Sequence, residues 1–383
     1  MEPKDRNEFR EADALSQEVR GYQYLLPMAP PQLQKRVRSS FMDVSDEPPA
    51  PPVGPEYHID ETTRTLRDRA RTLAPDALLG LAVGDALGAQ VEFMPRGSFP
   101  HVTEMTGGGP FELEPGQWTD DTTMAVCLAE SLLANRWFKR YDFADRLLAW
   151  YRDGVNSVNG RCFDIGNTTR RALERYEAGG DAYMADYAPD TAGNGSTVRV
   201  TPIAIMFRKR LADLSILAES QSSVTHEASE AEGCAKVLSM VLADGLYGGT
   251  PEEVLRRRGV VAPTHSFLAG AGEWKGKSRD EISSSGYAVH TLEAALWSVG
   301  QAESFEEAVV TAVNLGDDAD SVGAVAGQVA GAIWGASAIP DRWLEKLAWR
   351  DRLTALADAL FETAPVPRGR DVYAGVPPGA SAA

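Results

Sequence analysis

Residues 314–335 read NLGDDADSVGAVAGQVAGAIWG, and from Ala319 onward their apolar residues recur at helical intervals. Glycine or alanine recurs at close intervals after Ser321, so another helix can approach the backbone of this segment tightly. Residues 80–93, GLAVGDALGAQVEF, have a similar small-residue composition. Both stretches are therefore expected to form closely packed helices.

Helical periodicity extends over most of the chain from about Ala74 onward. Apolar residues recur there at three- and four-residue intervals, Ala, Leu and Glu are plentiful, and convincing period-two strand patterns are missing. Segments with this pattern are Thr123–Phe138, Tyr141–Tyr151, Thr168–Glu177, Pro202–Leu217, Thr225–Leu246, Val289–Val299 and Ala319–Gly335. The expected fold is all-α, with one compact multi-helix domain over residues 71–364.

The two ends of the chain differ in composition from this domain. Residues 47–59, EPPAPPVGPEYHI, favour extended polyproline geometry over helix. Residues 1–70 are therefore expected to be an N-terminal extension, and residues 365–383 a flexible tail. The extension carries the apolar residues Tyr22, Tyr24, Leu25, Leu26 and Met28. It is either an arm that docks on a partner or a segment that folds back on its own domain.

Composition excludes several classes of function. A formal charge of −17 argues against non-specific nucleic-acid binding, which needs a basic surface. The polar N-terminus is not a signal peptide, and no apolar run is long enough to span a membrane. Cys127 and Cys234 lie in apolar helical patterns and are expected to be buried. A cytoplasmic location without membrane partners is the expectation.

Two acidic segments carry the candidate chemistry: residues 116–123, GQWTDDTT, and residues 316–321, GDDADS. Each follows a glycine at the entry to an expected helix, where the bent backbone lets neighbouring side chains converge. Their carboxylates and hydroxyls are hard oxygen ligands, which suit Mg²⁺ or Mn²⁺ better than Zn²⁺. Ordinary N-capping is the alternative for Thr119 and the aspartates that follow it. Asp317 is expected to tune charge without binding a cation.

Two further segments add polar groups. Glu92 ends the small-residue segment 80–93 and is either part of a site or merely exposed. Residues 193–196, Gly-Asn-Gly-Ser, offer backbone N–H groups to a phosphate, although such a turn is also common without a ligand.

Seven blocks together resemble the ADP-ribosylglycohydrolase family, most closely the branch similar to dinitrogenase-reductase-activating glycohydrolase. They are GLAVGDALGAQVEF, WTDDTTM, FDIGNTTRRAL, GNGSTVRVTP, THEASEAEGCA, GYAVHTLEAALW and NLGDDADSVGAVAGQVAGAIWG, in order from about residue 75 to 360. The resemblance implies an all-α domain that holds two Mg²⁺ or Mn²⁺ ions. The implied metal ligands are Thr119, Asp120, Asp121, Asp318, Asp320 and Ser321. Ser321 stands where threonine is commoner in the family, and both residues supply a hydroxyl.

The same resemblance implies the remaining site residues and the reaction. The implied catalytic carboxylates are Glu92, Asp121 and Asp164. Implied contacts to ADP-ribose are Asn194, Gly195 and Ser196 at the diphosphate, with Tyr287 stacking on adenine or ribose. The implied reaction is hydrolysis of an N-glycosidic bond between ADP-ribose and arginine in a modified protein. Simpler alternatives stay open: Asp164 as a helix cap, Tyr287 as a partly buried aromatic and His226 as a core histidine.

The extension suggests a second function. A glycohydrolase domain with an added arm resembles bacterial immunity proteins that pair with ADP-ribosyltransferase toxins. The enzyme would reverse the toxin's modification. The alternative is a binding-type inhibitor whose arm occludes the active site of the transferase.

Overall fold

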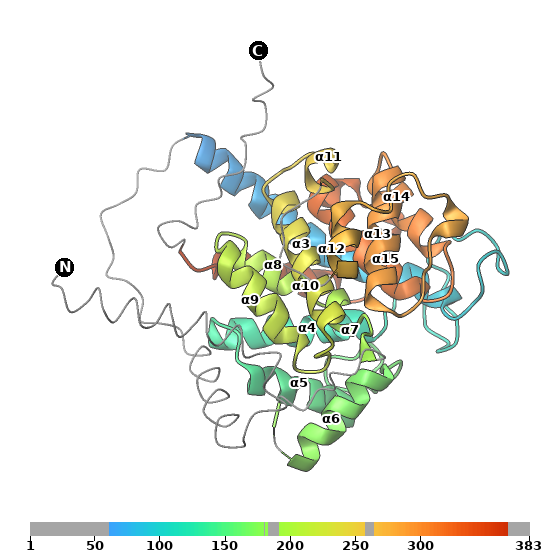
Figure 1. Ribbon diagram of the computed structural model, residues 1–383. Coiled ribbons are helices and arrows are strands. Elements are labelled where there is room, and N and C mark those ends of the chain that lie inside the picture. The colour runs from blue at the N-terminus through green and yellow to red at the C-terminus, as the bar shows by residue number, and fades with distance from the viewer. Residues whose placement is uncertain (1–60, 180, 183–190, 257–263, 367–383) are drawn as a thin grey trace. The chain divides into compact units, whose positions relative to one another are not determined.

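The structure is a computed structural model that describes residues 61–179, 181–182, 191–256 and 264–366 (Figure 1). The chain divides into residues 1–57 and 58–383, and all described residues belong to the second unit. The expected tail therefore lies almost wholly outside the described residues, as does most of the expected arm, including its apolar cluster.

The described residues form fifteen α-helices and no β-strand, which confirms the all-α prediction. The first six are α3 (Glu61–Gly88), α4 (Asp120–Asn135), α5 (Arg140–Asp153), α6 (Asn167–Gly179), α7 (Gly195–Val198) and α8 (Thr201–Phe207). The next five are α9 (Leu211–Ser222), α10 (Ser229–Leu246), α11 (Pro251–Val254), α12 (Thr264–Ala271) and α13 (Ala288–Gln301). The last four are α14 (Phe305–Val313), α15 (Ala319–Trp334), α16 (Asp341–Leu344) and α17 (Arg350–Glu362). Short 3₁₀ turns lie at Ala89–Val91, Arg279–Glu281 and Ala336–Ala338.

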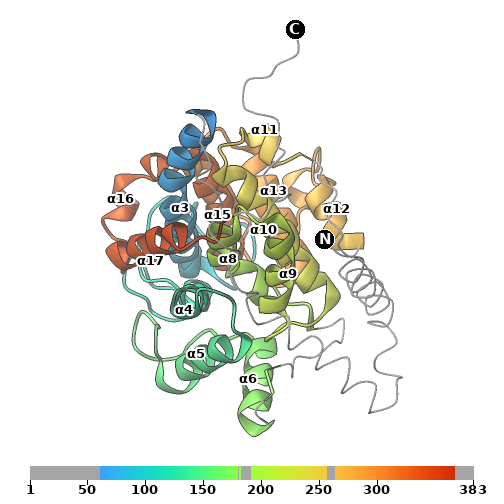
Figure 2. The ribbon, with the colours of Figure 1, turned by 90° about the vertical axis from the view of Figure 1, so that its left-hand side faces the viewer.

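Helices α3 and α15 form the central pair and lie side by side (Figure 2). A methyl group at Gly80 would lie 2.1 Å from the carbonyl oxygen of Gly327, and one at Gly84 would lie 1.9 Å from that of Gly323. Gly88 packs in the same way on the backbone of Asp320. In these contacts the residue numbers rise along α3 as they fall along α15, so the two helices are antiparallel. The C-terminal end of α3 therefore meets the N-terminal end of α15.

The other helices surround this pair. α4, α8, α10, α14 and α17 contact α3, and α10, α13 and α14 contact α15. α9 and α12 pack on α10, while α5 packs on α4 and carries α6 at the bottom of Figure 1. Large side chains that are fully buried include Trp118, Trp150, Trp343, Phe207 and Phe305. The core is thus continuous around the central pair.

One expected helix is wrong: Pro202–Leu217 is divided into α8 and α9. The break contains Arg208 and Arg210, whose side chains are buried. The guanidinium carbon of Arg208 lies 3.7 Å from the centre of the Phe361 ring, and that of Arg210 lies 5.1 Å from the Trp137 ring. Burying two guanidinium groups on aromatic rings stabilises a turn where helical periodicity alone predicts continuation.

Other boundaries shift less. α10 begins at Ser229, after the expected start at Thr225. α3 begins at Glu61, so the expected domain boundary near residue 70 falls within a helix, and the division into three regions stays a prediction. Cys127 and Cys234 are buried, as expected. Within the described ranges, every helix is too short or too polar to cross a bilayer.

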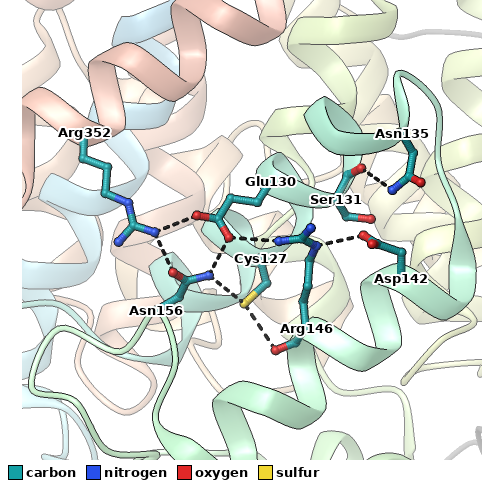
Figure 3. A network of polar contacts seen from close by, with 8 residues as sticks. All are labelled: Cys127, Glu130, Ser131, Asn135, Asp142, Arg146, Asn156 and Arg352. Atoms are coloured by element: carbon teal, nitrogen blue, oxygen red, sulfur yellow. Dashed lines mark hydrogen bonds and ion pairs between the residues drawn. The ribbon is translucent and has the colours of Figure 1, made fainter.

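A polar network ties α4, α5 and α17 together (Figure 3). Glu130 of α4 lies at its centre and accepts hydrogen bonds from Arg146 at 3.1 Å, Asn156 at 3.0 Å and Arg352 at 2.7 Å. Arg352 also donates to the side-chain oxygen of Asn156 at 2.6 Å. One carboxylate therefore links α4, whose first turn belongs to the first acidic segment, to α5, to the loop that follows α5 and to α17.

Candidate active site

The two acidic segments meet in space, where the end of α3 and the starts of α4 and α15 come together. One carboxylate oxygen each from Glu92, Asp318 and Asp320 lie within 4.8 Å of one another. The hydroxyl of Thr119, at the N-cap of α4, donates to Asp320 Oδ2 at 3.1 Å. Residues far apart in sequence thus form one acidic cluster.

Both glycines that lead into these segments have a positive φ, a backbone conformation that other residues rarely adopt. Gly116 has a φ of +87°, and a methyl group there would lie 1.9 Å from the carbonyl oxygen of Lys346. Gly316 has a φ of +74° and packs on the backbone of Arg96. A positive φ together with such close backbone contact leaves room only for glycine. These turns direct the first residues of α4 and α15 toward the end of α3.

Asp85 of α3 is a residue that the sequence analysis missed. Its Oδ1 accepts a hydrogen bond from Thr119 N at 2.8 Å, and its Oδ2 accepts from Thr122 N at 3.0 Å and from the Thr122 hydroxyl at 2.6 Å. The carboxylate therefore caps α4 from another helix and fixes Asp120 and Asp121 in its first turn. The sequence does contain a signal for Asp85: it is a charged residue among the small and apolar residues 80–89, where a buried carboxylate needs hydrogen-bond partners.

Burial raises the pKa of every carboxyl in the cluster, and neighbouring carboxylates add to the shift for most of them. Burial and then Asp320 raise the pKa of Asp85 to about 7. The same two causes, in that order, raise the pKa of Asp164 to about 9 and that of Asp318 to about 8. Burial raises the pKa of Asp320 to about 6 and those of Glu92, Asp120 and Asp121 well above their usual range.

Several oxygens in the cluster lack a hydrogen-bond donor. Glu92 Oε2, Asp121 Oδ2 and Asp320 Oδ1 are buried without a hydrogen-bond partner. Buried, unpaired carboxylate oxygens are costly unless a cation or protons neutralise them. Three such atoms beside a threonine hydroxyl are the hard donor set that a divalent cation uses. The residues present therefore fit a metal ion.

The remaining expected ligands lie in or beside this cluster. Asp120 and Asp121 occupy the first turn of α4, and both are buried. Ser321 is buried and hydrogen-bonds to Asp318. Asp317, which is not among the expected ligands, is exposed and has a φ of +54°.

Asp164 approaches the cluster from the loop before α6. It shares a side-chain hydrogen bond with Glu92 and has a φ of +57°. A positive φ at a residue other than glycine is uncommon, and such strain often accompanies a functional position. The structure thus pairs the carboxyl group of Asp164 with that of Glu92.

The Gly-Asn-Gly-Ser turn contacts Asp318. Asn194 Nδ2 donates to Asp318 Oδ2 at 2.6 Å and to the Thr291 hydroxyl at 2.9 Å. A methyl group at Gly195 would lie 2.9 Å from His226 Cε1, so the turn packs directly on that ring. Ser196 is fully buried, and its hydroxyl accepts a hydrogen bond from Ser222 at 2.7 Å.

Tyr287 and His226 flank the same turn. Residue Gly193 pairs with Tyr287 in an isolated antiparallel bridge, and the Tyr287 hydroxyl donates to Glu230. The ring of Tyr287 is half-buried and makes an edge contact with His290. His226 is buried, its Nδ1 lies 2.8 Å from the Thr225 hydroxyl, and burial lowers its pKa to about 3. This is the environment of a neutral core histidine.

Comparisons with known proteins agree with this arrangement. An ADP-ribosylarginine hydrolase (Tri1) from Pseudomonas putida is 46% identical over 92% of this chain and 94% of its own length. A second one, from Serratia proteamaculans, is 48% identical over 76% of this chain and 80% of its own length. The ADP-ribosyl-[dinitrogen reductase] glycohydrolase of Rhodospirillum rubrum is 35% identical over 75% of this chain and 92% of its own length.

Similarity also extends to solved structures and to a family model. A structure described as an ADP-ribosylglycohydrolase-related protein complex superimposes with a TM-score of 0.70 at 44% identity, and the match covers 78% of this chain and 100% of that one. The model of the ADP-ribosylglycohydrolase family matches residues 62–369. The chain therefore belongs to the ADP-ribosylglycohydrolase family.

Proposed function

We propose that this protein is a metal-dependent hydrolase that removes ADP-ribose from arginine side chains of modified proteins. The observation that carries the proposal is the 46% identity, over 92% of the chain, to a relative named as an ADP-ribosylarginine hydrolase. The acidic cluster at the ends of α3, α4 and α15 supports it, because its oxygens suit a divalent cation.

The proposed cofactor is a pair of Mg²⁺ or Mn²⁺ ions. When bound, such ions orient ribose hydroxyls and lower the pKa of a water molecule toward neutrality. The residues that would hold them are Thr119, Asp120, Asp121, Asp318, Asp320 and Ser321. Asn194 supports one of these ligands, because its amide donates to Asp318 and fixes the orientation of that carboxylate.

Hydrolysis places the oxygen of water on C1″ of the ribose, breaks the C1″–N bond and returns a proton to the departing guanidine nitrogen. Glu92 and Asp164 share a hydrogen bond, and burial raises the pKa of both carboxyl groups. This pair is suited to take a proton from water and to give one to the leaving nitrogen. Asp121, buried and with an unpaired oxygen, is the other candidate base. The surrounding aspartates stabilise positive charge that develops near C1″.

The turn at residues 193–196 and Tyr287 are the proposed contacts to the rest of ADP-ribose. Backbone N–H groups at Gly195 and Ser196 would face the diphosphate, whereas Asn194 N donates to the carbonyl oxygen of Gly286 at 3.1 Å, so Asn194 would contribute through its position in the turn. Pairing of Gly193 with Tyr287 places the two elements together, beside Asp318. Adenine or ribose would stack on the Tyr287 ring.

Incubation with arginine- and serine-linked ADP-ribosyl proteins, with and without a chelator, tests the proposal. We expect release of ADP-ribose from the arginine-linked substrate, loss of activity with chelator, and recovery with added Mg²⁺ or Mn²⁺. Asp318→Asn is expected to abolish release, while Asp317→Asn, a change at the exposed neighbour, retains it. Full activity in the presence of chelator would exclude the metal-dependent mechanism.

A second role follows from residues 1–57. The P. putida relative aligns over 351 residues, more than residues 58–383 contain, so the similarity includes part of this N-terminal unit. A shared extension outside the catalytic unit supports a role in docking. We infer an arm that binds a partner ADP-ribosyltransferase, in the manner of an immunity protein.

Deletion of residues 1–57 separates this role from catalysis. The cut precedes α3, so the catalytic unit keeps its helices. We expect the truncated protein to release ADP-ribose at the normal rate but to lose stoichiometric inhibition of the transferase. A truncated protein that still inhibits at equal concentrations would contradict the docking role.

A further inference from the structure

Three phenylalanine rings form a cluster next to the catalytic carboxylates, and we call Phe93, Phe111 and Phe163 the aromatic rim. The ring centres of Phe93 and Phe111 are 6.5 Å apart, and those of Phe111 and Phe163 are 5.2 Å apart. The three rings come from separate segments: the residues just after the 3₁₀ turn Ala89–Val91, the loop before α4 and the loop before α6.

The aromatic rim is coupled to the site by sequence position. Phe93 directly follows Glu92, and Phe163 directly precedes Asp164. Those two carboxyl groups share a hydrogen bond. Two of the three rings therefore belong to residues that are bonded directly to the proposed proton-transfer residues. The rings and the carboxyl groups cannot move far from one another.

The aromatic rim is more exposed to solvent than is usual for three large apolar side chains in contact. The Phe93 side chain is 64% exposed, and Phe111 and Phe163 are only half-buried. A single exposed phenylalanine needs no explanation, but three rings in contact, two of them adjacent in sequence to buried carboxyl residues, indicate a surface that binds a ligand.

The backbone holds Phe93 in this exposed position. Its φ is +62°, a conformation that is costly for a bulky side chain. Two hydrogen bonds fix it: Phe93 N donates to the carbonyl oxygen of Asp317 at 2.7 Å, and Asp317 N donates to that of Met94 at 2.8 Å. The loop that carries Phe111 is equally constrained, because a methyl group at Gly109 would lie 2.3 Å from the carbonyl oxygen of Ala89. The rim is thus anchored to the acidic segment and to the end of α3.

We propose that the aromatic rim binds the guanidinium group of the ADP-ribosylated arginine and so determines which linkage the enzyme accepts. The inference rests on the proposed function. A guanidinium is planar and cationic, stacks on aromatic faces and is attracted to their electrons. The adjacent carboxylates add attraction for a cation. A neutral leaving group, such as a serine hydroxyl, would gain neither interaction.

Two substitutions at Phe93 test this proposal, with kcat/KM measured on a peptide that carries ADP-ribosyl-arginine. Phe93→Leu keeps much of the volume but removes the aromatic face, and we expect kcat/KM to fall roughly five- to thirtyfold, mainly through KM. Phe93→Trp keeps an aromatic face and is expected to retain activity within about threefold. Ile216→Ala, at a 46% exposed residue of α9, is the matched control and should change nothing.

Binding of free ADP-ribose distinguishes the guanidinium from other occupants. ADP-ribose lacks the arginine, so its Kd is expected to stay within about twofold of wild type in Phe93→Leu. Equal weakening of ADP-ribose binding and of kcat/KM would overturn the inference, because the rim would then contact the nucleotide. Unchanged kcat/KM in Phe93→Leu would also overturn it. A wild-type protein that binds ADP-ribose but leaves the arginine-linked peptide intact would instead refute the proposed function.

Discussion

Gly84 and Gly323 lie in direct backbone contact at the centre of the molecule. A methyl group built at Gly84 would come within 1.9 Å of the carbonyl oxygen of Gly323, and one at Gly323 within 2.5 Å of that of Gly84. Backbone cannot shift as a flexible side chain can. This contact therefore sets the distance between α3 and α15, and with it the distance between Glu92, which follows the C-terminal end of α3, and Asp320, in the first turn of α15.

Substitution Gly84→Ala is expected to destabilise the protein by roughly 2–5 kcal/mol, because the added methyl group must push the two helices apart. Urea unfolding followed by circular dichroism measures the loss. Gly166→Ala is the control, since a methyl group there would meet nothing within 4 Å and the φ of Gly166 is not positive. A stability of Gly84→Ala within about 0.5 kcal/mol of wild type would show that the helix pair tolerates separation.

Substitution Asp85→Asn is expected to lower stability by about 2–4 kcal/mol, because the carboxylate accepts three hydrogen bonds at the start of α4 and an amide can accept only part of them. Thermal unfolding measures this change. Thr122→Val removes only one of the three donors and should cost less. Since Asp85 also positions Asp120, we expect weaker metal binding in Asp85→Asn, and unchanged metal affinity would argue against a positioning role.

The sequence predicts much of this arrangement because its strongest signals are local. Small residues in 80–93 and 314–335 indicate close helix packing, and a glycine before each acidic segment indicates a bend. Which helix packs on which depends on contacts between Gly84 and Gly323, far apart along the chain. Periodicity within one segment contains no information about its partner, so this pairing is not predicted by the pattern alone.

The features that the sequence analysis missed also depend on contacts between residues that are far apart along the chain. Asp85 caps α4 across a distance of 34 residues, so no local capping pattern reveals it. The break between α8 and α9 depends on rings of Phe361 and Trp137 that receive the buried guanidinium groups of Arg208 and Arg210. Helical periodicity cannot anticipate a turn that is stabilised by residues elsewhere in the chain.

A double-mutant cycle between Glu130 and Arg352 tests the network in Figure 3. Both side chains are partly exposed, and their atoms lie 2.7 Å apart. We expect a coupling free energy of roughly 0.5–1 kcal/mol for Glu130→Gln with Arg352→Met, since solvent screens such a pair. Chemical unfolding of the four proteins measures it. Strict additivity would indicate that Arg146 and Asn156 alone hold Glu130 in place.

The pH dependence of stability should contain a contribution from Glu232. Burial and then the neighbouring Glu219 carboxylate raise the pKa of Glu232 to about 8, although the Ser223 hydroxyl donates to it at 2.8 Å and Lys236 lies nearby. Between the ordinary value of 4.5 and about 8, the folded protein holds a proton that the unfolded chain has lost. The contribution of Glu232 to stability is therefore present at low pH and is lost as the pH rises through this window.

Glu232→Gln removes this titration and keeps the shape of the side chain. Relative to wild type, we expect this variant to gain stability from about pH 5 to about pH 8 and then to level off, because the glutamine need not be deprotonated inside the protein. Unfolding free energies at pH 5, 7 and 9 measure the trend. Glu303→Gln, the same substitution at an exposed residue, is the control. A flat difference for Glu232→Gln would mean that the folded protein holds Glu232 with its ordinary pKa.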